Sequence, residues 1–219
     1  MCGRYYIDDT MFREVRSDFP ELRLTKTAAG DIFTKTAAGD IFTKTAAGNI
    51  FTKTVAGDIR PSGPAPVIRK EGGNLTMDLK MVWGFPAHGS LLINARSETA
   101  AELPAFRSGI RSRRCLIPAA GFYERDRERS LVSFTRDGRS VLYLAGLYDL
   151  YPEGDRFVIL TTAANRSMAP VHDRMPLMIE PDDAEMWLDD FESAAEMMRC
   201  EMPEVRAHRN YQQLSFDFH

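Results

Sequence analysis

Several features that would assign this chain to a common protein class are missing from its 219 residues. No apolar run is long enough to cross a bilayer, which excludes a membrane-spanning helix, and no signal peptide opens the chain. The cysteines, Cys2, Cys115 and Cys200, are widely spaced and form no CxxC pair. Their odd number and spacing exclude a disulfide framework and a zinc site. We therefore expect a cytoplasmic protein in a reducing compartment, with no metal or other cofactor.

The chain also lacks the strong positive charge of a general nucleic-acid binder. It has 28 Lys and Arg residues against 31 Asp and Glu residues, which gives a net charge of −3. The charge is spread unevenly, because arginines gather between residues 107 and 114 whereas residues 182–201 are strongly acidic. A local basic face can therefore still bind phosphate groups.

A nine-residue repeat occupies residues 25–60. Residues 25–33 read TKTAAGDIF, residues 34–42 are identical, and residues 43–51 differ only at Asn49. The fourth copy, residues 52–60, reads TKTVAGDIR, so the series indicates a recent tandem duplication. Ile, Phe and Thr followed by an Ala-Gly turn favour short β-hairpins, although an extended surface loop also fits. Calcium binding is disfavoured, because the second glycine of the calcium-binding nonapeptide repeats is missing.

Outside the repeats, the sequence predicts many short strands and few helices. Helices are expected at residues 8–19, from 99 to about 106, at 182–189 and at 192–199. Strands are expected at residues 4–7, 65–69, 75–82, 91–94, 114–118, 121–124, 131–135, 141–147 and 157–163. The dipeptide Asp137-Gly138 predicts a hairpin between the strands on either side of it. This order predicts one α+β domain over residues 1–219, with a mainly antiparallel sheet curled into a barrel-like core, flanking helices and the repeats as an insert.

The residue with the most distinctive reactivity follows the first methionine. Removal of Met1 would give Cys2 a free α-amine beside its thiol. Such a 1,2-aminothiol reacts selectively with aldehydes, because the amine forms an imine and the thiol then closes a five-membered ring. An α-amine titrates near pH ~8, so a useful fraction is neutral at pH 7. The alternative is that Cys2 belongs to a frayed terminus and has no role.

Further polar residues follow strong strand or turn signals. Asn94 ends one apolar strand, with Arg96 two residues later, and Glu124 ends another. A carboxylate in such a position can be partly desolvated, which raises its pKa and suits proton transfer. His172 lies in a turn region beside Asp173 and can be oriented for the same work. Each has a structural alternative, as a helix cap for Asn94, an ion-pair partner for Glu124 and a loop residue for His172.

Blocks of this sequence resemble, in the same order, those of the SRAP family (SOS-response-associated peptidases, abasic-site processing proteins). The blocks are Met1-Cys2-Gly3-Arg4, Trp83-Gly84-Phe85, Asn94-Ala95-Arg96-Ser97-Glu98-Thr99, Cys115-Leu116-Ile117-Pro118-Ala119-Ala120-Gly121-Phe122-Tyr123-Glu124 and His172-Asp173-Arg174-Met175-Pro176. Together they are highly specific and cover nearly all of the chain outside the repeats. The resemblance implies an α+β domain with a barrel-like sheet core, and a mature Cys2 that links covalently to abasic sites in single-stranded DNA.

The resemblance also implies a role for each matching residue. Cys2 is the nucleophile and its α-amine forms the imine, while Asn94 holds the Cys2 end of the chain. Glu124 and His172 move protons during sugar-ring opening, imine formation and reversal of the crosslink. Autoproteolytic removal of the residue before Cys2 is a further implied activity. The residues implied to bind DNA are Arg4, Arg96, Trp83 and Arg125.

The chain departs from the family pattern in two respects. Arg125 stands where the family usually has tryptophan, which removes a stacking surface and puts a cation beside Glu124. The family also has no nine-residue repeats. Residues 58–62, which follow from the last copy, resemble the family's own sequence there. The inserted material is therefore expected to be the earlier copies.

Other functions remain open at the level of sequence. The first alternative is an N-terminal-nucleophile peptidase or amidase in which Cys2 attacks an amide carbonyl. The second is a single-stranded DNA-binding protein without covalent chemistry. The tail, residues 213–218, is also similar to short peptides that bind bacterial sliding clamps, but the favoured interpretation is that Phe216 and Phe218 pin the terminus to the protein's own core.

Overall fold

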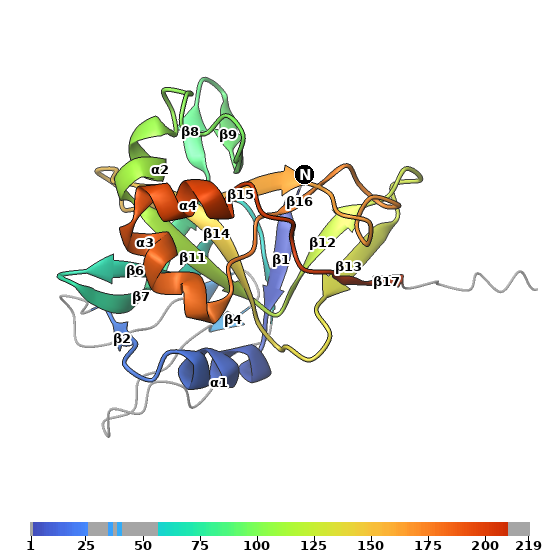
Figure 1. Cartoon of the computed structure of the whole chain (residues 1–219), viewed down its shortest axis with the longest axis horizontal. Coiled ribbons are helices and arrows are strands. Elements are labelled where there is room, and N and C mark those ends of the chain that lie inside the picture. Colours follow the sequence, from blue (N-terminus) through green and yellow to red (C-terminus); the bar gives the residue numbers. More distant parts are fainter. Residues whose placement is uncertain (1, 26–34, 37–38, 41–56, 210–219) are drawn as a thin grey trace, which may run out of the picture.

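A strongly curved sheet of eight strands forms the larger part of the fold (Figure 1). The computed structural model describes residues 2–25, 35–36, 39–40 and 57–209. The strands of this sheet, in spatial order, are β10 (Asn94–Arg96), β15 (Arg156–Ala163), β14 (Leu142–Asp149), β11 (Arg114–Ala119), β6 (Pro64–Glu71), β7 (Asn74–Trp83) and β2 (Arg23–Leu24), with β16 (Arg174–Pro176) paired to β15.

The larger sheet closes on itself. Strand β7 pairs with β6 along one edge and with β15 along the other, where Trp83 lies opposite Phe157. Strands β15, β14, β11, β6 and β7 therefore form a ring, and all six residues of β11 are buried. A continuous run of apolar residues is typical of strands that are covered on both faces. The prediction of a mainly antiparallel sheet curled into a barrel-like core is confirmed.

A second sheet of five strands holds the start of the chain. One of its faces is apolar, because Tyr5, Ile7, Phe122 and Phe134 alternate with more exposed residues along their strands. The rings of Phe122 and Phe134 stack with their centroids 5.1 Å apart. In spatial order the strands are β17 (Arg206–Arg209), β13 (Leu131–Thr135), β12 (Gly121–Arg125), β1 (Arg4–Ile7) and β5 (Gly57–Ile59).

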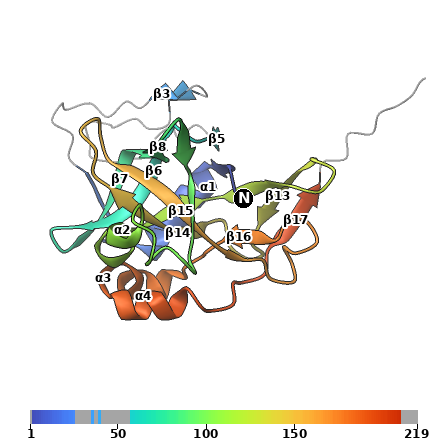
Figure 2. The same cartoon turned by 90° about the horizontal axis from the view of Figure 1, so that it is seen from above.

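Short helices cover the sheets. Helix α1 (Asp9–Asp18) begins where the Asp8 carboxylate accepts a hydrogen bond from the Met11 N–H at 2.7 Å, and it ends before Pro20. On the larger sheet, α2 and α3 lie against β11, and α4 packs on both of these helices (Figure 2). None of the helices in the described ranges is long and apolar enough to cross a membrane. The remaining helices are α2 (Arg107–Ser112), the 3-10 turn η1 (Pro181–Asp183), α3 (Ala184–Asp189) and α4 (Phe191–Met197).

The second repeat copy contains a short antiparallel ladder. Strand β3 (Lys35–Thr36) pairs with β4 (Gly39–Asp40), as expected for a hairpin in this copy. The other parts of the repeat, residues 26–34, 37–38 and 41–56, lie outside the described residues, as does the tail from residue 210. A further ladder joins β8 (Phe85–Ala87) to β9 (Ser90–Leu92).

The helix expected from residue 99 to about 106 is wrong. This segment forms successive turns, and the helix begins only at Arg107. Pro104 explains the difference, because its ring disfavours the helical conformation of Leu103 and it has no N–H to donate.

The hairpin expected around Asp137-Gly138 is only partly present. Gly138 has φ +75°, and the backbones of Arg136 and Arg139 form an isolated bridge. The flanking strands then separate, since β13 pairs with β12 and β17 whereas β14 pairs with β11 and β15. The chain therefore crosses from one sheet to the other at this turn, because β13 belongs to the five-stranded sheet and β14 to the eight-stranded sheet.

Candidate active site at the N-terminus

Strand β1 brings Cys2 into the interior of the protein. The side chain of Cys2 is 2% exposed, and its thiol donates a hydrogen bond of 3.6 Å to the carbonyl oxygen of Arg4. Strand β1 lies between β12 and β5, so Cys2 enters the fold beside the end of a fully paired strand. Both views place the start of β1 near β15 and β16 (Figures 1 and 2). Cys2 is thus an ordered part of the fold and not a frayed end.

Asn94 fixes the backbone of Cys2. Its Nδ2 donates a hydrogen bond of 2.8 Å to the carbonyl oxygen of Cys2, over 92 positions of sequence. Strand β10 holds Asn94 in place by parallel pairing with β15, where Asn94 lies opposite Ile159. The Oδ1 atom of Asn94 is buried and accepts no hydrogen bond within the described part of the chain. This oxygen is therefore an available acceptor next to Cys2.

Glu124 supplies a buried carboxylate that acts on the Cys2 thiol. The side chain is 8% exposed, and its Oε1 accepts a hydrogen bond of 3.1 Å from the backbone N–H of Arg125. Burial raises the pKa of the Cys2 thiol to about 12; the hydrogen bond to Arg4 lowers it, and the charge of Glu124 raises it. The thiol is therefore protonated at neutral pH, and it needs a base before it can act as a nucleophile.

His172 lies in the loop between β15 and β16. Its Nδ1 is 3.0 Å from the backbone nitrogen of Arg174 and 3.0 Å from Oδ1 of Asp173. In the neutral ring Nδ1 accepts the hydrogen bond from Arg174, which leaves the proton on Nε2. In the protonated ring Nδ1 donates to Asp173 instead. Nδ1 of His172 therefore has a hydrogen-bond partner whether or not it carries a proton.

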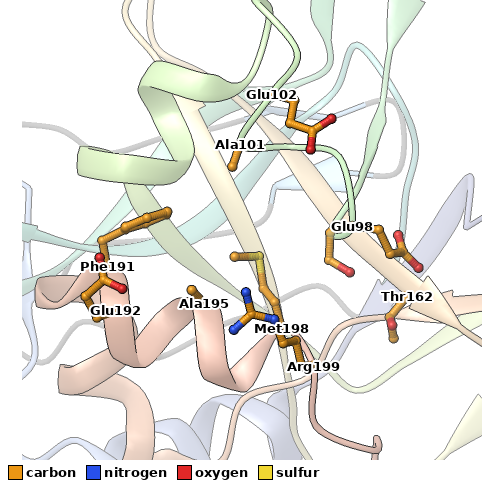
Figure 3. Close-up of a pocket in the computed structure, with 10 residues that line it drawn as sticks. Glu98, Ala101, Glu102, Thr162, Phe191, Glu192, Ala195, Met198 and Arg199 are labelled. Carbon is orange, nitrogen blue, oxygen red and sulfur yellow. The ribbon is translucent and has the colours of Figure 1, made fainter.

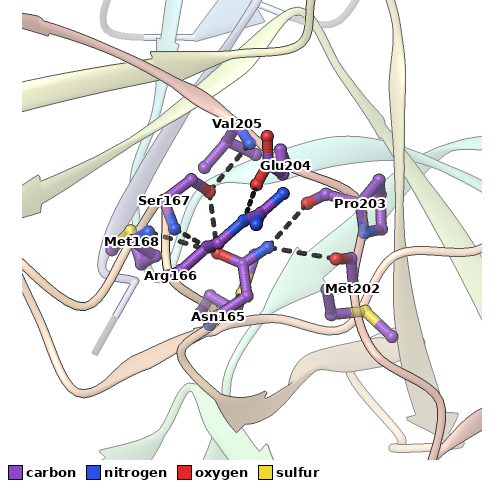
Figure 4. A network of polar contacts seen from close by, with 9 residues as sticks. Asn165, Arg166, Ser167, Met168, Met202, Pro203, Glu204 and Val205 are labelled. Carbon is purple, nitrogen blue, oxygen red and sulfur yellow. Dashed lines mark hydrogen bonds and ion pairs between the residues drawn. The ribbon is translucent and has the colours of Figure 1, made fainter.

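The loop that carries His172 is anchored by a network around Asn165 (Figure 4). The Nδ2 of Asn165 donates to the carbonyl oxygens of Met202 and Pro203, both at 3.0 Å. Its Oδ1 accepts hydrogen bonds from the backbone N–H groups of Ser167 at 3.1 Å and of Met168 at 3.2 Å. These bonds fix the start of the loop against the segment between α4 and β17.

The Arg174 side chain anchors the end of the same loop. It forms two hydrogen bonds with the Glu98 carboxylate, at 2.6 and 2.8 Å, and a third of 2.6 Å with the carbonyl oxygen of Thr161. The Arg174 guanidinium lowers the pKa of Glu98. Glu98 follows the strand that bears Asn94 and Arg96, so this ion pair ties that strand to the His172 loop. Arg96 itself is exposed.

A cavity of about 220 Å³ lies beside Gly3 and Glu124, and the residues that line it do not include Cys2, Asn94 or His172. Arg4 lies on its wall, where its guanidinium pairs with Asp58 and sits 4.6 Å above the ring centroid of Tyr123. Sequence reasoning missed Asp58, Arg60 and Tyr123. A signal for Arg60 was present, because this copy of the repeat ends in arginine where the others end in phenylalanine. The cavity is lined by Gly3, Arg4, Arg60, Tyr123, Glu124, Arg125 and Leu131.

Trp83 does not lie on the surface of this site. Its side chain is fully buried, and its Nε1 donates a hydrogen bond of 2.8 Å to the carbonyl oxygen of Ile93. The indole stacks on Phe157 at 6.3 Å and packs against Tyr5 at 5.3 Å. The expectation that Trp83 contacts DNA is therefore wrong, because no face of the ring is accessible. The ring instead packs against Tyr5 of β1.

A larger cavity of about 600 Å³ lies between α4 and the loop that follows β10 (Figure 3). The carboxylates of Glu98, Glu102 and Glu192 surround it, together with Arg199 and an apolar floor that includes Phe191. Its acidic rim repels phosphate groups. Within the described residues, no set of three or more His, Cys, Asp or Glu side chains is arranged to hold a metal ion. We take the smaller cavity as the candidate active site, because it is lined by Gly3 and Arg4, which follow Cys2, and by Glu124, whose charge acts on the Cys2 thiol.

Curated relatives match part of this chain. The abasic site processing protein YoqW of Bacillus subtilis is 36% identical over 110 residues, which are 46% of this chain and 49% of the relative. The abasic site processing protein YedK of Escherichia coli is 32% identical over 104 residues, or 44% of this chain and 47% of the relative. The aligned segments span about half the length of these curated relatives.

Solved structures share the fold. A phage-related protein from Bordetella bronchiseptica has a TM-score of 0.68 at 23% identity, and covers 96% of this chain and 95% of its own. A second protein from the same organism has a TM-score of 0.67 at 21% identity, and covers 95% of this chain and 99% of its own. The family model described as SOS response associated peptidase (SRAP) matches residues 1–212. Because this match covers nearly the whole sequence, the chain belongs to the SRAP family.

Proposed function

We propose that this protein processes abasic sites in single-stranded DNA, and that Cys2 without Met1 forms a covalent thiazolidine link to the sugar. The observation that carries the proposal is the hydrogen bond from Asn94 to the carbonyl of Cys2, beside a thiol that the Glu124 charge reaches. The curated relatives YoqW and YedK are named abasic site processing proteins, which supports the same class of substrate.

The reaction balances with one water released. The ring-opened abasic sugar presents an aldehyde at C1′, and the α-amine of Cys2 attacks this carbon. Loss of water gives an imine. The thiol then adds to the imine carbon, its proton ends on the nitrogen, and the five-membered thiazolidine closes.

The buried carboxylate of Glu124 fits the role of the base in ring closure. Since the thiol pKa is raised to about 12, the proton of Cys2 has to leave as the sulfur attacks. His172 fits a second proton-transfer role in ring opening, water loss and reversal, because both of its charge states have a hydrogen-bond partner. Asn94 keeps the amine and thiol in a fixed orientation, and its unpaired Oδ1 can accept a hydrogen bond from the liberated amine.

DNA contacts in this proposal come from exposed and half-buried arginines. Arg4 and Arg125 line the basic cavity, and Arg96 lies at the end of β10 beyond Asn94. The clamp-binding role expected for residues 213–218 lies outside the described residues.

The deciding experiment incubates the Met1-free protein with a single-stranded oligonucleotide that contains one abasic site. We expect an adduct that survives heat and denaturant. Hydrolysis of amides without an adduct would support the peptidase alternative. Salt-sensitive binding alone would support a non-covalent DNA-binding protein.

Replacing His172 by alanine is expected to slow adduct formation or reversal by ~10²–10⁴, the usual value of one general acid–base contact. Binding of undamaged DNA should change little, because the ring is assigned no phosphate contact. Single-turnover kinetics on denaturing gels, repeated across a range of pH, measure the effect. Unchanged rates and an unchanged pH profile would remove His172 from the mechanism.

Deleting residues 25–51 is expected to leave crosslinking intact. The deletion keeps the last repeat copy and its continuation into β5, which pairs with β1 beside the site. The measurement is the adduct yield of the deletion variant relative to the full chain, with thermal melting as the control for folding. A folded but unreactive variant would show that the repeats belong to the DNA site.

A further inference from the structure

Two of the arginines that line the basic cavity beside Cys2 form no ion pair within the described residues. We propose that Arg60 and Arg125 form a phosphate-binding subsite, which grips the DNA backbone next to the sugar that reacts. This inference rests on the proposed function and assigns to the site its means of holding the strand. It also gives a role to Arg60, at the end of the last repeat copy.

Strand register places these arginines on opposite sides of β1. In β12, Arg125 lies opposite Leu131 and two residues beyond Tyr123, which is paired with Arg4. In β5, Ile59 is paired with Tyr5, so the next residue, Arg60, continues alongside Arg4. Both side chains line the cavity together with Gly3. The residue that follows Cys2 therefore lines the same cavity as both arginines.

The backbones of both arginines are fixed. Arg60 begins a turn with Pro61 in which its carbonyl oxygen accepts a hydrogen bond of 3.1 Å from the Gly63 N–H. Arg125 is held at the end of the β12–β13 hairpin, where its Nη1 donates a hydrogen bond of 2.6 Å to the carbonyl oxygen of Arg129. The backbone segments that carry the two arginines are therefore in place before DNA binds.

Two other charged residues line the cavity: Glu124, whose Oε1 accepts a hydrogen bond from the backbone N–H of Arg125, and Arg4. Arg4 is paired with Asp58 and lies over Tyr123. In contrast, no carboxylate of the described residues forms an ion pair with Arg60 or Arg125, and both side chains are exposed. A guanidinium has several N–H donors in one plane, and phosphate oxygens match that arrangement.

A phosphodiester is the ligand that this arrangement favours. Any strand that delivers a sugar to Cys2 also delivers the phosphates on the two sides of that sugar. Gly3, which has no side chain, lets the strand approach the backbone closely between the arginines. Single-stranded DNA can be held by stacking of its bases on aromatic side chains or by charge along its backbone. In this cavity we expect the arginines to hold it by charge.

The test measures binding of undamaged single-stranded DNA to the full chain with Cys2→Ala, so that covalent chemistry does not contribute. Fluorescence anisotropy at several salt concentrations gives the slope of log K against log salt. Each phosphate contact adds about 0.7 to this slope for single strands. We expect Arg60→Ala and Arg125→Ala each to make the slope shallower by about 0.7, and the double variant by about 1.4. The ratio of the affinity of the Cys2→Ala parent to that of each single variant should then fall about 2.6-fold between 50 and 200 mM salt.

The matched controls are Arg60→Lys and Arg125→Lys, which keep the charge, and Arg107→Ala, which removes an exposed arginine on α2. The lysine variants should retain most of the slope, and Arg107→Ala should match the parent. Thermal melting checks that every variant folds. If folded Arg60→Ala and Arg125→Ala keep the slope of the Cys2→Ala parent, the subsite is overturned, even if the protein with intact Cys2 forms adducts. Shallower slopes without any adduct from intact Cys2 would instead keep the subsite and refute the covalent function.

Discussion

Cys2→Ala is expected to abolish the heat-stable adduct with abasic single-stranded DNA, since no thiol remains to close the ring. Cys2→Ser should give at most a weak imine that borohydride reduces, because a hydroxyl closes the five-membered ring poorly. Denaturing gels with and without borohydride measure both products. A Cys2→Ala protein that still yields the heat-stable adduct would exclude the thiazolidine mechanism.

Retention of Met1 provides an independent control for this prediction. A chain with a bulky residue inserted between Met1 and Cys2 keeps the Cys2 thiol and retains Met1, so its α-amine lies on Met1 and the nitrogen of Cys2 stays in a peptide bond. It should be as inactive as Cys2→Ala. Thermal melting separates loss of chemistry from loss of fold, because Cys2 is buried and Asn94 bonds to its carbonyl oxygen, which every substitution retains.

Glu124→Gln is expected to slow thiazolidine closure by ~10²–10⁴ and to leave an imine that accumulates. The substitution removes a negative charge that raises the pKa of the Cys2 thiol, so that pKa should fall. A lower thiol pKa alone would speed ring closure. The predicted slowing therefore requires loss of the base to outweigh the change in pKa.

Borohydride trapping during the reaction distinguishes these two effects. In Glu124→Gln we expect more trapped imine and less thiazolidine than in the wild type at equal times, and Glu124→Asp should recover part of the rate. Faster ring closure in Glu124→Gln would contradict the assignment of Glu124 as the base, and would leave it only an electrostatic effect on the thiol.

Local patterns predicted the elements that present the site. Arg4–Ile7 and Gly121–Arg125 are short segments rich in aromatic and β-branched residues, and both form strands close to their expected bounds. Asn94 and Glu124 end apolar runs; Asn94 bonds to the carbonyl oxygen of Cys2 and the charge of Glu124 acts on the Cys2 thiol, while their chemical roles stay predictions. Apolar periodicity is strong where one face of a strand is buried, so it identifies such elements well.

Long-range pairing was not predictable in the same way. No local signal shows that the strands flanking Asp137-Gly138 belong to different sheets, because their partners come from distant segments. The resemblance implies that Trp83 binds DNA, yet β15 pairs beside it and its ring is buried. Arg60 reaches the cavity only because β5 pairs with β1.

The most direct test of the account is the intact mass of the product formed with an abasic oligonucleotide, followed by peptide mapping. The account predicts the mass of the Met1-free protein plus the oligonucleotide less one water, with the modification on Cys2. An adduct on any lysine, or an unmodified Cys2 in a crosslinked protein, would contradict it.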